Sequence, residues 1–292
     1  MRPLKLQTTA MTGPDVSDWQ IFLKSKGLLQ GIADGEFGPK SDAATRAWQN
    51  SAGLSPDGVV GADTIAKATA DGYQSTTGAN LAGMDANINC LPFAGQLSAS
   101  GIQFVARYYS DNPRKTLTPS EADELSRQGI DVVTVFEDSN NSSNLFSSAT
   151  GQSHASKAIQ IAASIGQPGG TAIYFAVDFD PSAGDLEGPI SDYFKAVNDV
   201  IAGAQTQYVV GVYGSGLTCR LIRDAGLAKF TWLTCSTGFT EYLAFRRQAD
   251  IVQLAPERVL LSGLTIDDDI AQSNEFGAFR IAQARTATGM PT

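Results

Sequence analysis

The sequence predicts an α/β protein with a (β/α)8-type barrel, irregular in its last unit, behind a small all-α module of three helices. Two observations predict this fold. After residue 80, eight short runs of β-branched and aromatic residues alternate with amphipathic stretches, which is typical of βα units and a parallel sheet. Before residue 75, apolar residues recur at helical spacing. The predicted boundaries are 1–74 for the module, 75–81 for a linker rich in Ser, Thr and Gly, and 82–292 for the barrel.

The first module is predicted from helical periodicity and from a repeated turn. Apolar residues within 15–27 recur at i, i+3, i+6 and i+7, the spacing of one helix face. The phrase Asp-Gly-x-(Phe/Val)-Gly occurs at 34–38 and again, 23 residues later, at 57–61, each time before a further helix. Aromatic residues at helix spacing form a core more often than a ligand platform. We therefore expect a core role for Trp19, Phe22, Phe37 and Trp48.

This module resembles the family of small three-helix peptidoglycan-binding domains. The resemblance covers about residues 13–72 and rests on a DVxxWQ-like opening, DGxFG, an AxxxWQ helix and a GLxxDGVVG loop. It implies that the module binds peptidoglycan in a groove near the turns. The candidate wall-binding residues are therefore Asp34, Gly35 and Asp57.

The barrel is predicted from its strand-like runs, several of which are apolar throughout, as in strands that are covered on both faces. These runs are 81–86, 102–109, 131–138, 171–178, 207–214, 230–236, 250–255 and 264–271. Helices are predicted over 119–129, 153–166, 189–205, 217–227 and 240–249. Between the seventh and eighth runs there is no room for a regular helix, so the last unit is expected to be incomplete.

Acidic and aromatic residues stand at or just after the C-terminal ends of these runs. In a parallel barrel these ends converge on one face, where active sites are built from several strands. Carboxylates crowded there raise one another's pKa, so that a protonated acid can coexist with an ionised partner, as glycoside hydrolysis requires. The candidate catalytic residues are Asp85, Glu137, Asp178, Asp180 and Asp267. The candidate substrate-binding residues are Tyr108, Tyr109, Tyr213, Trp232, Gln253 and Asp269.

A structural alternative applies to some of these residues. Tyr108, Tyr213 and Trp232 are equally suited to closing the barrel mouth as to stacking on sugars. A single Asp after a strand often caps the next helix or forms a turn. Several acidic residues that meet in space are not explained in this way, so the set is expected to be functional.

The strand ends resemble the glycoside hydrolase family 25 lysozymes and, more closely, a bacterial glycoside-hydrolase-like family related to them. The resemblance spans about residues 82–285 and rests on GMDAN, YFAVDFD, GVYGS and IVQLA…GLTIDDD. It implies that Asp85 and Asp267 are cleft carboxylates and that Asp178 is the electrostatic or nucleophilic member of the catalytic pair. Asp180 stands where the lysozymes have their general-acid Glu.

The Asp at position 180 is a departure from the lysozyme pattern. Its side chain is one methylene shorter than Glu, and a displacement on the order of 1 Å can cost about a hundredfold in rate. We therefore hypothesise that Glu137 is the general acid and Asp178 its partner, with Asp180 as the alternative acid.

Other classes of function are disfavoured by composition. The chain has one histidine, His154, and three cysteines without CxxC spacing, which argues against a zinc amidase and against a Cys/His peptidase. The net charge is −9, and residues 75–292 carry 22 acidic against 14 basic side chains, so nucleic-acid binding is not expected. No cofactor and no metal are implied, and a monomer is expected.

The expected function is therefore peptidoglycan hydrolysis by a lysozyme-like glycosidase. The sequence shows neither a secretory signal nor an apolar stretch long enough for a membrane span. We expect synthesis in the cytoplasm and action at the bacterial wall after release, as for a phage endolysin or the cargo of a secretion machine. The competing hypothesis is a non-catalytic carbohydrate-binding or regulatory protein on the same barrel. The bond cleaved, its stereochemistry and the host range stay open.

Overall fold

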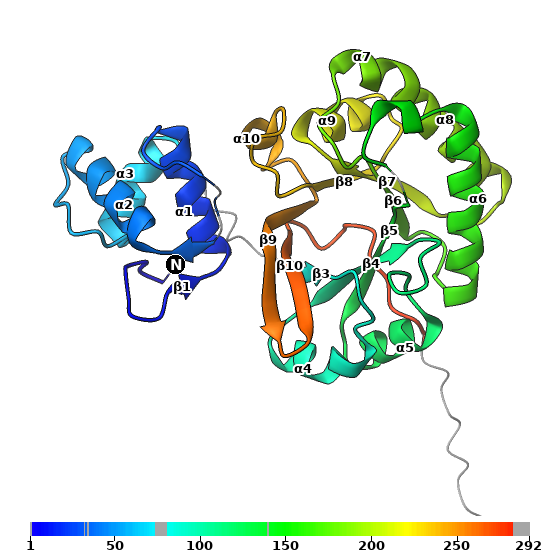
Figure 1. The fold of residues 1–292 in the computed structure, drawn as a ribbon, viewed down its shortest axis with the longest axis horizontal. Helices are drawn as coiled ribbons and strands as arrows, with labels where there is room; N and C mark the ends of the chain where they lie inside the picture. The colour runs from blue at the N-terminus through cyan, green and yellow to red at the C-terminus, as the bar shows by residue number, and fades with distance from the viewer. Residues whose placement is uncertain (1, 32, 34, 74–80, 139, 283–292) are drawn as a thin grey trace, which may run out of the picture.

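The structure is a computed structural model that describes residues 2–31, 33, 35–73, 81–138 and 140–282. A small N-terminal module lies beside a larger barrel (Figure 1). The candidate Asp34 and most of the predicted linker lie outside the described residues. In the described part of the chain, every helix is too short or too polar to span a membrane.

Three helices form the N-terminal module, as predicted. They are α1 (Pro14–Ser25), α2 (Pro39–Ser51) and α3 (Ala62–Ala70), and β1 (Met11–Thr12) pairs with β2 (Glu36–Phe37) beside them. The rings of Trp19, Phe22 and Trp48 pack with their centroids 5.1–5.5 Å apart. These rings and Phe37 are buried, which confirms the predicted core role.

A glutamine holds each of the two repeated turns. Gln20 Oε1 accepts a hydrogen bond from the Gly35 amide at 2.8 Å, and Gln49 Oε1 accepts one from the Gly58 amide at 2.9 Å. Gly35 and Gly58 have φ angles of 71° and 72°, a left-handed conformation that glycine adopts at little cost. The sequence repeat is thus a repeated structural unit, in which a Trp-Gln pair places the Trp in the core and the Gln on a turn.

All eight predicted runs form strands of one closed barrel, in the order β10-β3-β4-β5-β6-β7-β8-β9. The strands are β3 (Leu81–Asp85), β4 (Phe104–Tyr109), β5 (Asp131–Phe136), β6 (Ala172–Ala176), β7 (Val209–Gly214), β8 (Phe230–Leu233), β9 (Ile251–Leu261) and β10 (Leu264–Ala271). The predicted α/β barrel is therefore confirmed. Strands β3 to β9 run parallel to one another.

The direction of the last strand corrects the prediction. β10 runs antiparallel to both β9 and β3, because only residues 262 and 263 separate it from β9, which allows a hairpin but no crossover. Asp267 and Asp269 therefore do not stand at the C-terminal end of their strand. Asp267 lies within β10, opposite Asp85 of β3. The reversed strand still brings Asp267 to the mouth of the barrel.

Helices cover most of the outside of the barrel (Figure 1). They are α4 (Ala94–Ala99), α5 (Pro119–Arg127), α6 (Ser148–Ile165), α7 (Ala183–Asp185), α8 (Ser191–Gly203), α9 (Gly216–Asp224) and α10 (Tyr242–Phe245), with single turns η1 (Leu91–Phe93), η2 (Ser143–Leu145) and η3 (Leu186–Ile190). The predicted helix over 240–249 is shorter than expected. Glu241 has a φ of 60°, so a helix cannot begin before Tyr242.

The core of the barrel has two layers. Side chains such as Phe104, Tyr174 and Trp232 fill the inside, and a second layer lies between the strands and the surrounding helices. Phe276, which follows β10, is also buried in the inner layer, against Phe104. The inside is therefore packed with side chains, and polar side chains can gather only towards its mouth.

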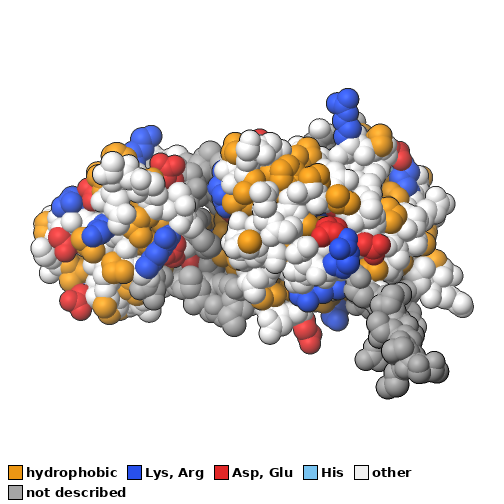
Figure 2. All heavy atoms as spheres, turned by 90° about the horizontal axis from the view of Figure 1, so that it is seen from below, with side chains coloured by type: hydrophobic (Ala, Val, Ile, Leu, Met, Phe, Trp, Pro, Cys, Tyr) orange, Lys and Arg blue, Asp and Glu red, His pale blue; other side chains and the backbone are white. Residues whose placement is uncertain are grey.

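The N-terminal module contacts the barrel at β9, beside the connection that lacks a helix. Ile21 of α1 belongs to the outer hydrophobic layer of the barrel, and Ser17 Oγ donates to the Leu254 carbonyl oxygen at 3.5 Å. Arg246 and Asp18 form a buried ion pair at 2.6 Å. The module thus covers a face that a complete eighth unit would cover with a helix. On the face drawn in Figure 2, the coloured acidic and basic side chains are interspersed over both parts of the molecule.

Candidate active site

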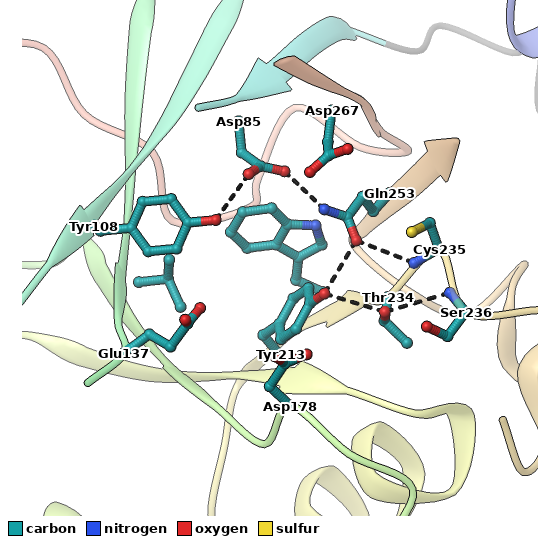
Figure 3. A pocket seen from close by; sticks show the side chains of 12 residues that line it. Asp85, Tyr108, Glu137, Asp178, Tyr213, Thr234, Cys235, Ser236, Gln253 and Asp267 are labelled. Carbon is teal, nitrogen blue, oxygen red and sulfur yellow. Dashed lines mark hydrogen bonds between the residues drawn. The ribbon is translucent and has the colours of Figure 1, made fainter. Parts of the chain in front are cut away.

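A cavity of about 270 Å³ opens at the mouth of the barrel. Its lining combines four carboxylates with aromatic and amide side chains, and it draws on all eight strands of the barrel or the loops that follow them (Figure 3). The lining residues are Asp85, Tyr108, Val135, Glu137, Asp178, Tyr213, Trp232, Thr234, Cys235, Ser236, Gln253 and Asp267. Eight of the eleven residues predicted for the barrel site therefore meet in one cavity.

Asp85 and Asp267 lie together on one side of the cavity (Figure 3). Asp85 is 2% exposed and accepts hydrogen bonds from Tyr108 OH at 2.9 Å and Gln253 Nε2 at 2.8 Å. Burial raises the pKa of Asp85 to about 6, although these hydrogen bonds oppose the shift. Asp267 is half-buried, and burial together with the neighbouring Asp85 charge raises its pKa to about 7. The pKa values of both carboxyl groups on this side of the cavity are thus raised towards neutral pH.

The orientation of Gln253 is fixed by its other hydrogen bonds. Its Oε1 accepts from Tyr213 OH at 3.0 Å and from the Cys235 amide at 3.1 Å. The Tyr213 hydroxyl is also 3.1 Å from Thr234 Oγ1. Because Oε1 faces these donors, the Gln253 amide group points its N–H towards Asp85. This network holds Asp85 in place from two strands.

Glu137 and Asp178 lie on the opposite side of the cavity (Figure 3). Lys115 Nζ is 2.6 Å from Glu137 Oε1 and 4.1 Å from the centre of the Tyr108 ring. Partial burial raises the pKa of Asp178, and the Lys115 charge opposes that shift. The cavity therefore has two carboxyl groups with clearly raised pKa values on one side, and a lysine-paired carboxyl group beside Asp178 on the other.

Lys115 was not among the candidates from the sequence. It lies in the loop between β4 and α5, and no strand end or motif marks it. Thr234, Cys235 and Ser236 were also missed, although they directly follow β8 and the strand-end rule covers them. Burial raises the pKa of Cys235 to about 12, so this residue is a neutral thiol in the cavity wall.

Three predicted residues do not line this cavity. The Asp180 carboxylate accepts hydrogen bonds from the Thr240 amide at 3.0 Å and from the Thr240 hydroxyl at 2.9 Å. β6 ends at Ala176, before both residues. The alternation of side chains along a strand, which would point Asp178 and Asp180 to the same side, therefore does not apply to them.

Tyr109 and Asp269 are both buried. Tyr109 follows Tyr108 along β4 and therefore faces the opposite side of the sheet, where its hydroxyl donates to Gln167 at 2.6 Å. Asp269 is 2% exposed and accepts a hydrogen bond from Trp232 Nε1 at 2.9 Å. Neither side chain is placed to contact a substrate in the cavity.

The described candidates in the N-terminal module have structural roles in the turns. Asp57 Oδ1 accepts hydrogen bonds from the Val59 amide and from Gln49 Nε2, both at 2.9 Å. Gly35 supplies the left-handed turn held by Gln20. Their predicted part in wall binding stays a prediction.

Other reactive side chains are separate from the cavity. His154 Nδ1 lies 3.0 Å from Tyr193 OH, and its ring packs on Phe136. Cys90 and Cys219 are buried free thiols. Within the described parts of the chain, no group of three or more His, Cys, Asp or Glu residues is arranged to hold a metal ion.

Comparison with known proteins gives two matches to family models. Residues 95–271 match the family described as Rv2525c-like, glycoside hydrolase-like domain, and residues 12–67 match a peptidoglycan binding domain. Both resemblances inferred from the sequence are thereby confirmed.

The similar proteins include curated relatives and a solved structure. YbfG and FadG of Bacillus subtilis (strain 168), both named as uncharacterized proteins, are 30% identical over 79% of this chain and 29% identical over 52% of it. These matches cover 33% and 27% of the relatives, so the chain spans a third of their length or less. The Tat-secreted protein Rv2525c of Mycobacterium tuberculosis, solved in complex with L-tartrate, has a TM-score of 0.58 and 25% identity, covering 68% of this chain and 98% of that one.

Proposed function

Because this chain belongs to the family of Rv2525c-like, glycoside hydrolase-like domains, we propose that it is a glycoside hydrolase that cuts the glycan strands of bacterial peptidoglycan. The observation that carries the proposal is the placement of carboxyl groups on opposite sides of one open cavity, with Glu137 and Asp178 on one side and Asp85 and Asp267 on the other. Asp267, with its pKa raised to about 7, retains a proton near neutral pH. Glu137, on the opposite side, is paired with the ammonium group of Lys115 at 2.6 Å.

Glycoside hydrolysis requires an acid and a second carboxyl group that face the bond to be cut. An acid protonates the leaving glycosidic oxygen, while a carboxylate attacks the sugar, activates water or stabilises the positive charge that develops on the ring. In the proposed reaction Asp267 donates the proton. Glu137, with Asp178 beside it, acts on the opposite side of the sugar. Asp85 is less suited to donate, since it is buried and both of its oxygens already accept hydrogen bonds.

This assignment differs from the hypothesis based on the sequence, in which Glu137 is the acid and Asp178 its partner. The earlier assignment stays a prediction, and Asp180 stays its alternative. The ion pair with Lys115, which already occupies Glu137 Oε1, is the reason for giving the acid role to Asp267 instead. Tyr108 and Tyr213 add aromatic surface to the wall of the cavity, where a sugar ring can pack.

The N-terminal module supports peptidoglycan as the substrate. Residues 12–67 match a family named for peptidoglycan binding, and α1 of this module contacts the barrel. In the proposal, the module holds the barrel against the wall. The related Rv2525c is Tat-secreted, which supports action outside the cytoplasm for this chain as well.

A second candidate function is glycan binding without cleavage. It is favoured by Asp180, which stands where the resembling lysozymes have their acid and is bound to Thr240 outside the cavity. If neither Asp267 nor Glu137 takes over the acid role, the same cavity holds a glycan but cannot cut it.

Digestion of purified peptidoglycan distinguishes these functions. Wild type, Asp267→Asn and Glu137→Gln are incubated with the wall, and both pelleting and released fragments are measured. The matched controls are Asp192→Asn and Glu187→Gln, which change exposed residues of α8 and η3. We expect release by wild type and both controls, and pelleting without release by the two cavity variants. Pelleting of wild type without release would support glycan binding alone, and full release by both cavity variants would contradict the proposed chemistry.

A further inference from the structure

Asp269 is a third carboxyl group that is buried beside Asp85 and Asp267. It lies two residues after Asp267 on β10, so both side chains are on the same face of the strand. Its cross-strand neighbours are Gly83 of β3 and Gln253 of β9. Asp85 lies two residues beyond Gly83, also on that face. Asp85, Asp267 and Asp269 therefore form a carboxyl cluster directed into the mouth of the barrel.

The contacts of Asp269 are incomplete for an ionised carboxylate. Oδ1 accepts a hydrogen bond from Trp232 Nε1 at 2.9 Å. Oδ2 is buried, and within the described residues no donor reaches it. The nearest carboxyl group across the strand pair is that of Asp85, two residues from Gly83, the register partner of Asp269. Two carboxyl groups can form a hydrogen bond only if one of them carries a proton.

The charged groups that face Asp269 are all acidic. They are Asp85 of β3 and Asp267 and Asp268 of its own strand, and each of them raises the pKa of Asp269. The flanking strands β8 and β9 contribute the neutral Trp232 and Gln253. Arg258 is paired with Asp268, the outward-facing neighbour. Burial is the largest contribution, and the pKa of Asp269 is well above its usual range.

We propose that Asp269 is a neutral carboxylic acid that donates its proton in a hydrogen bond to Asp85 and so holds Asp85 in position below the substrate. Two carboxyl groups this close cannot both be ionised without strong repulsion, as in other carboxyl pairs that share one proton. The ionised Asp85 then accepts from three donors: Tyr108, Gln253 and Asp269. Its charge in turn keeps the neighbouring Asp267 protonated.

Asp269 is thus a positioning residue, which acts on the reaction through Asp85. Its importance for hydrolysis rests on the proposed function, but its protonation does not, so the two can be tested separately. An asparagine at this position can still donate to Asp85 and accept from Trp232. A leucine of similar size can do neither, and it leaves two buried polar groups without a partner.

The direct test is a titration of the aspartate carboxyl carbons by carbon-13 nuclear magnetic resonance on the full chain. Asp269→Asn identifies the Asp269 signal, and Asp268→Asn identifies that of the outward-facing neighbour as a control. We expect the Asp269 signal to keep the position of a protonated acid at pH values where an ordinary aspartate, with a pKa of about 3.9, is already ionised. An Asp269 signal that titrates near this ordinary value would overturn the inference. This measurement needs no substrate and is valid whether or not the protein cuts peptidoglycan.

Activity tests the positioning role. Asp269→Asn is expected to release peptidoglycan fragments at close to the wild-type rate and with the same pH profile. Asp269→Leu is expected to lose about a hundredfold, the cost of a displacement on the order of 1 Å near the reacting atoms, with a shifted pH profile. Equal rates and equal pH profiles for the two variants would contradict the role. If Asp269→Leu does not fold, Asp269→Asn is compared with wild type alone. Loss of activity or a shifted pH profile in the Asn variant would then contradict the positioning role.

Discussion

At the scale of single residues, Lys115 determines how charge is divided across the cavity. Its Nζ contacts Glu137 at 2.6 Å and lies over the Tyr108 ring, and its charge opposes the rise in the pKa of Asp178 that burial causes. Asp85 and Asp267, on the far side, have no such cation among the contacts of the described residues, and their pKa values are raised. One loop residue thus makes the two sides of the cavity different in charge.

Replacing Lys115 should therefore weaken catalysis more than folding. We expect Lys115→Met to lower kcat/KM on peptidoglycan by about tenfold, equivalent to about 1.4 kcal/mol, because the Glu137 carboxyl group loses its ion-pair partner. Lys115→Arg should restore much of the rate. Lys195→Met, on the exposed surface of α8, is the control. A Lys115→Met rate equal to that of this control would show that the ion pair has no part in the reaction.

The carboxyl groups on the far side predict a dependence of stability on pH. The pKa values of Asp85 and Asp267 are raised from 3.8 to about 6 and about 7, so the folded protein binds these protons more tightly than the unfolded chain. The resulting stabilisation is complete below pH 3.8 and is lost as the pH rises through 6 and 7. The melting temperature should therefore fall between pH 5 and pH 8, and fall less in Asp267→Asn than in wild type.

Scanning calorimetry at both pH values measures this difference. Asp192→Asn, which changes an exposed residue on α8, should keep the wild-type dependence on pH. If Asp267→Asn also kept that dependence, the raised pKa of Asp267 would be disproved.

At the scale of elements, the packing of α6 on α8 depends on a glycine. A Cβ on Gly151 would lie 2.4 Å from the backbone oxygen of Tyr193, so the two helices would have to separate. We expect Gly151→Ala to destabilise the fold by about 1–3 kcal/mol, since overpacking has this cost, and to lower the melting temperature by several degrees. Gly203→Ala, at the end of α8 with no atom within 4 Å of its Cβ, is the control and should be neutral or stabilising. Equal melting temperatures of the two variants would contradict the close packing.

The elements also show how far the sequence alone predicts this fold. Apolar runs such as 131–136 and 172–176 identify buried strands because burial on both faces requires such runs. The end of β9 was not predictable in the same way. Beyond Gln253 the strand continues to Leu261. This part contains Glu257 and Arg258, so it lacks the apolar run from which a strand would be predicted. The hairpin, and with it the direction of β10, follows from that extension.

Residues of the site were predictable where the direction of a strand determines the position of the side chain. Asp85, Glu137 and Gln253 were identified because strand ends converge in a barrel. Lys115 was not, because its position depends on how a loop folds back over the mouth. Asp180 was misplaced relative to the cavity because alternation stops where β6 ends. The residues of the site that could not be predicted are therefore those whose positions depend on long-range contacts of loops.

At the scale of the whole molecule, the N-terminal module is also part of the structure of the barrel. It covers β9 where the hairpin to β10 leaves no helix, and a buried ion pair between Asp18 and Arg246 joins the two parts. The side chains of this pair are 0% and 6% exposed. The module and the barrel are thus joined by a buried interface.

Removing one partner of this pair should destabilise the molecule strongly. Asp18→Ala leaves the Arg246 charge buried, which typically costs about 3–5 kcal/mol. The double variant Asp18→Leu/Arg246→Met should recover most of the loss, since a buried ion pair can be replaced by apolar side chains at little cost. Asp192→Ala, which breaks the exposed pair with Lys195, should change the stability by less than about 1 kcal/mol. Chemical denaturation measures all three, and an Asp18→Ala variant as stable as Asp192→Ala would disprove the docking.

The most direct test of the central claim is the chemical identity of the ends that wild type creates in purified peptidoglycan. Mass spectrometry of the released fragments, after reduction with borohydride, shows whether a new reducing sugar end has formed. The proposed hydrolase predicts new reducing ends whose number grows with time and falls to background in Asp267→Asn. Release of peptides without new reducing ends, or no release by wild type that nevertheless pellets with the wall, would contradict the claim that this barrel cuts glycan.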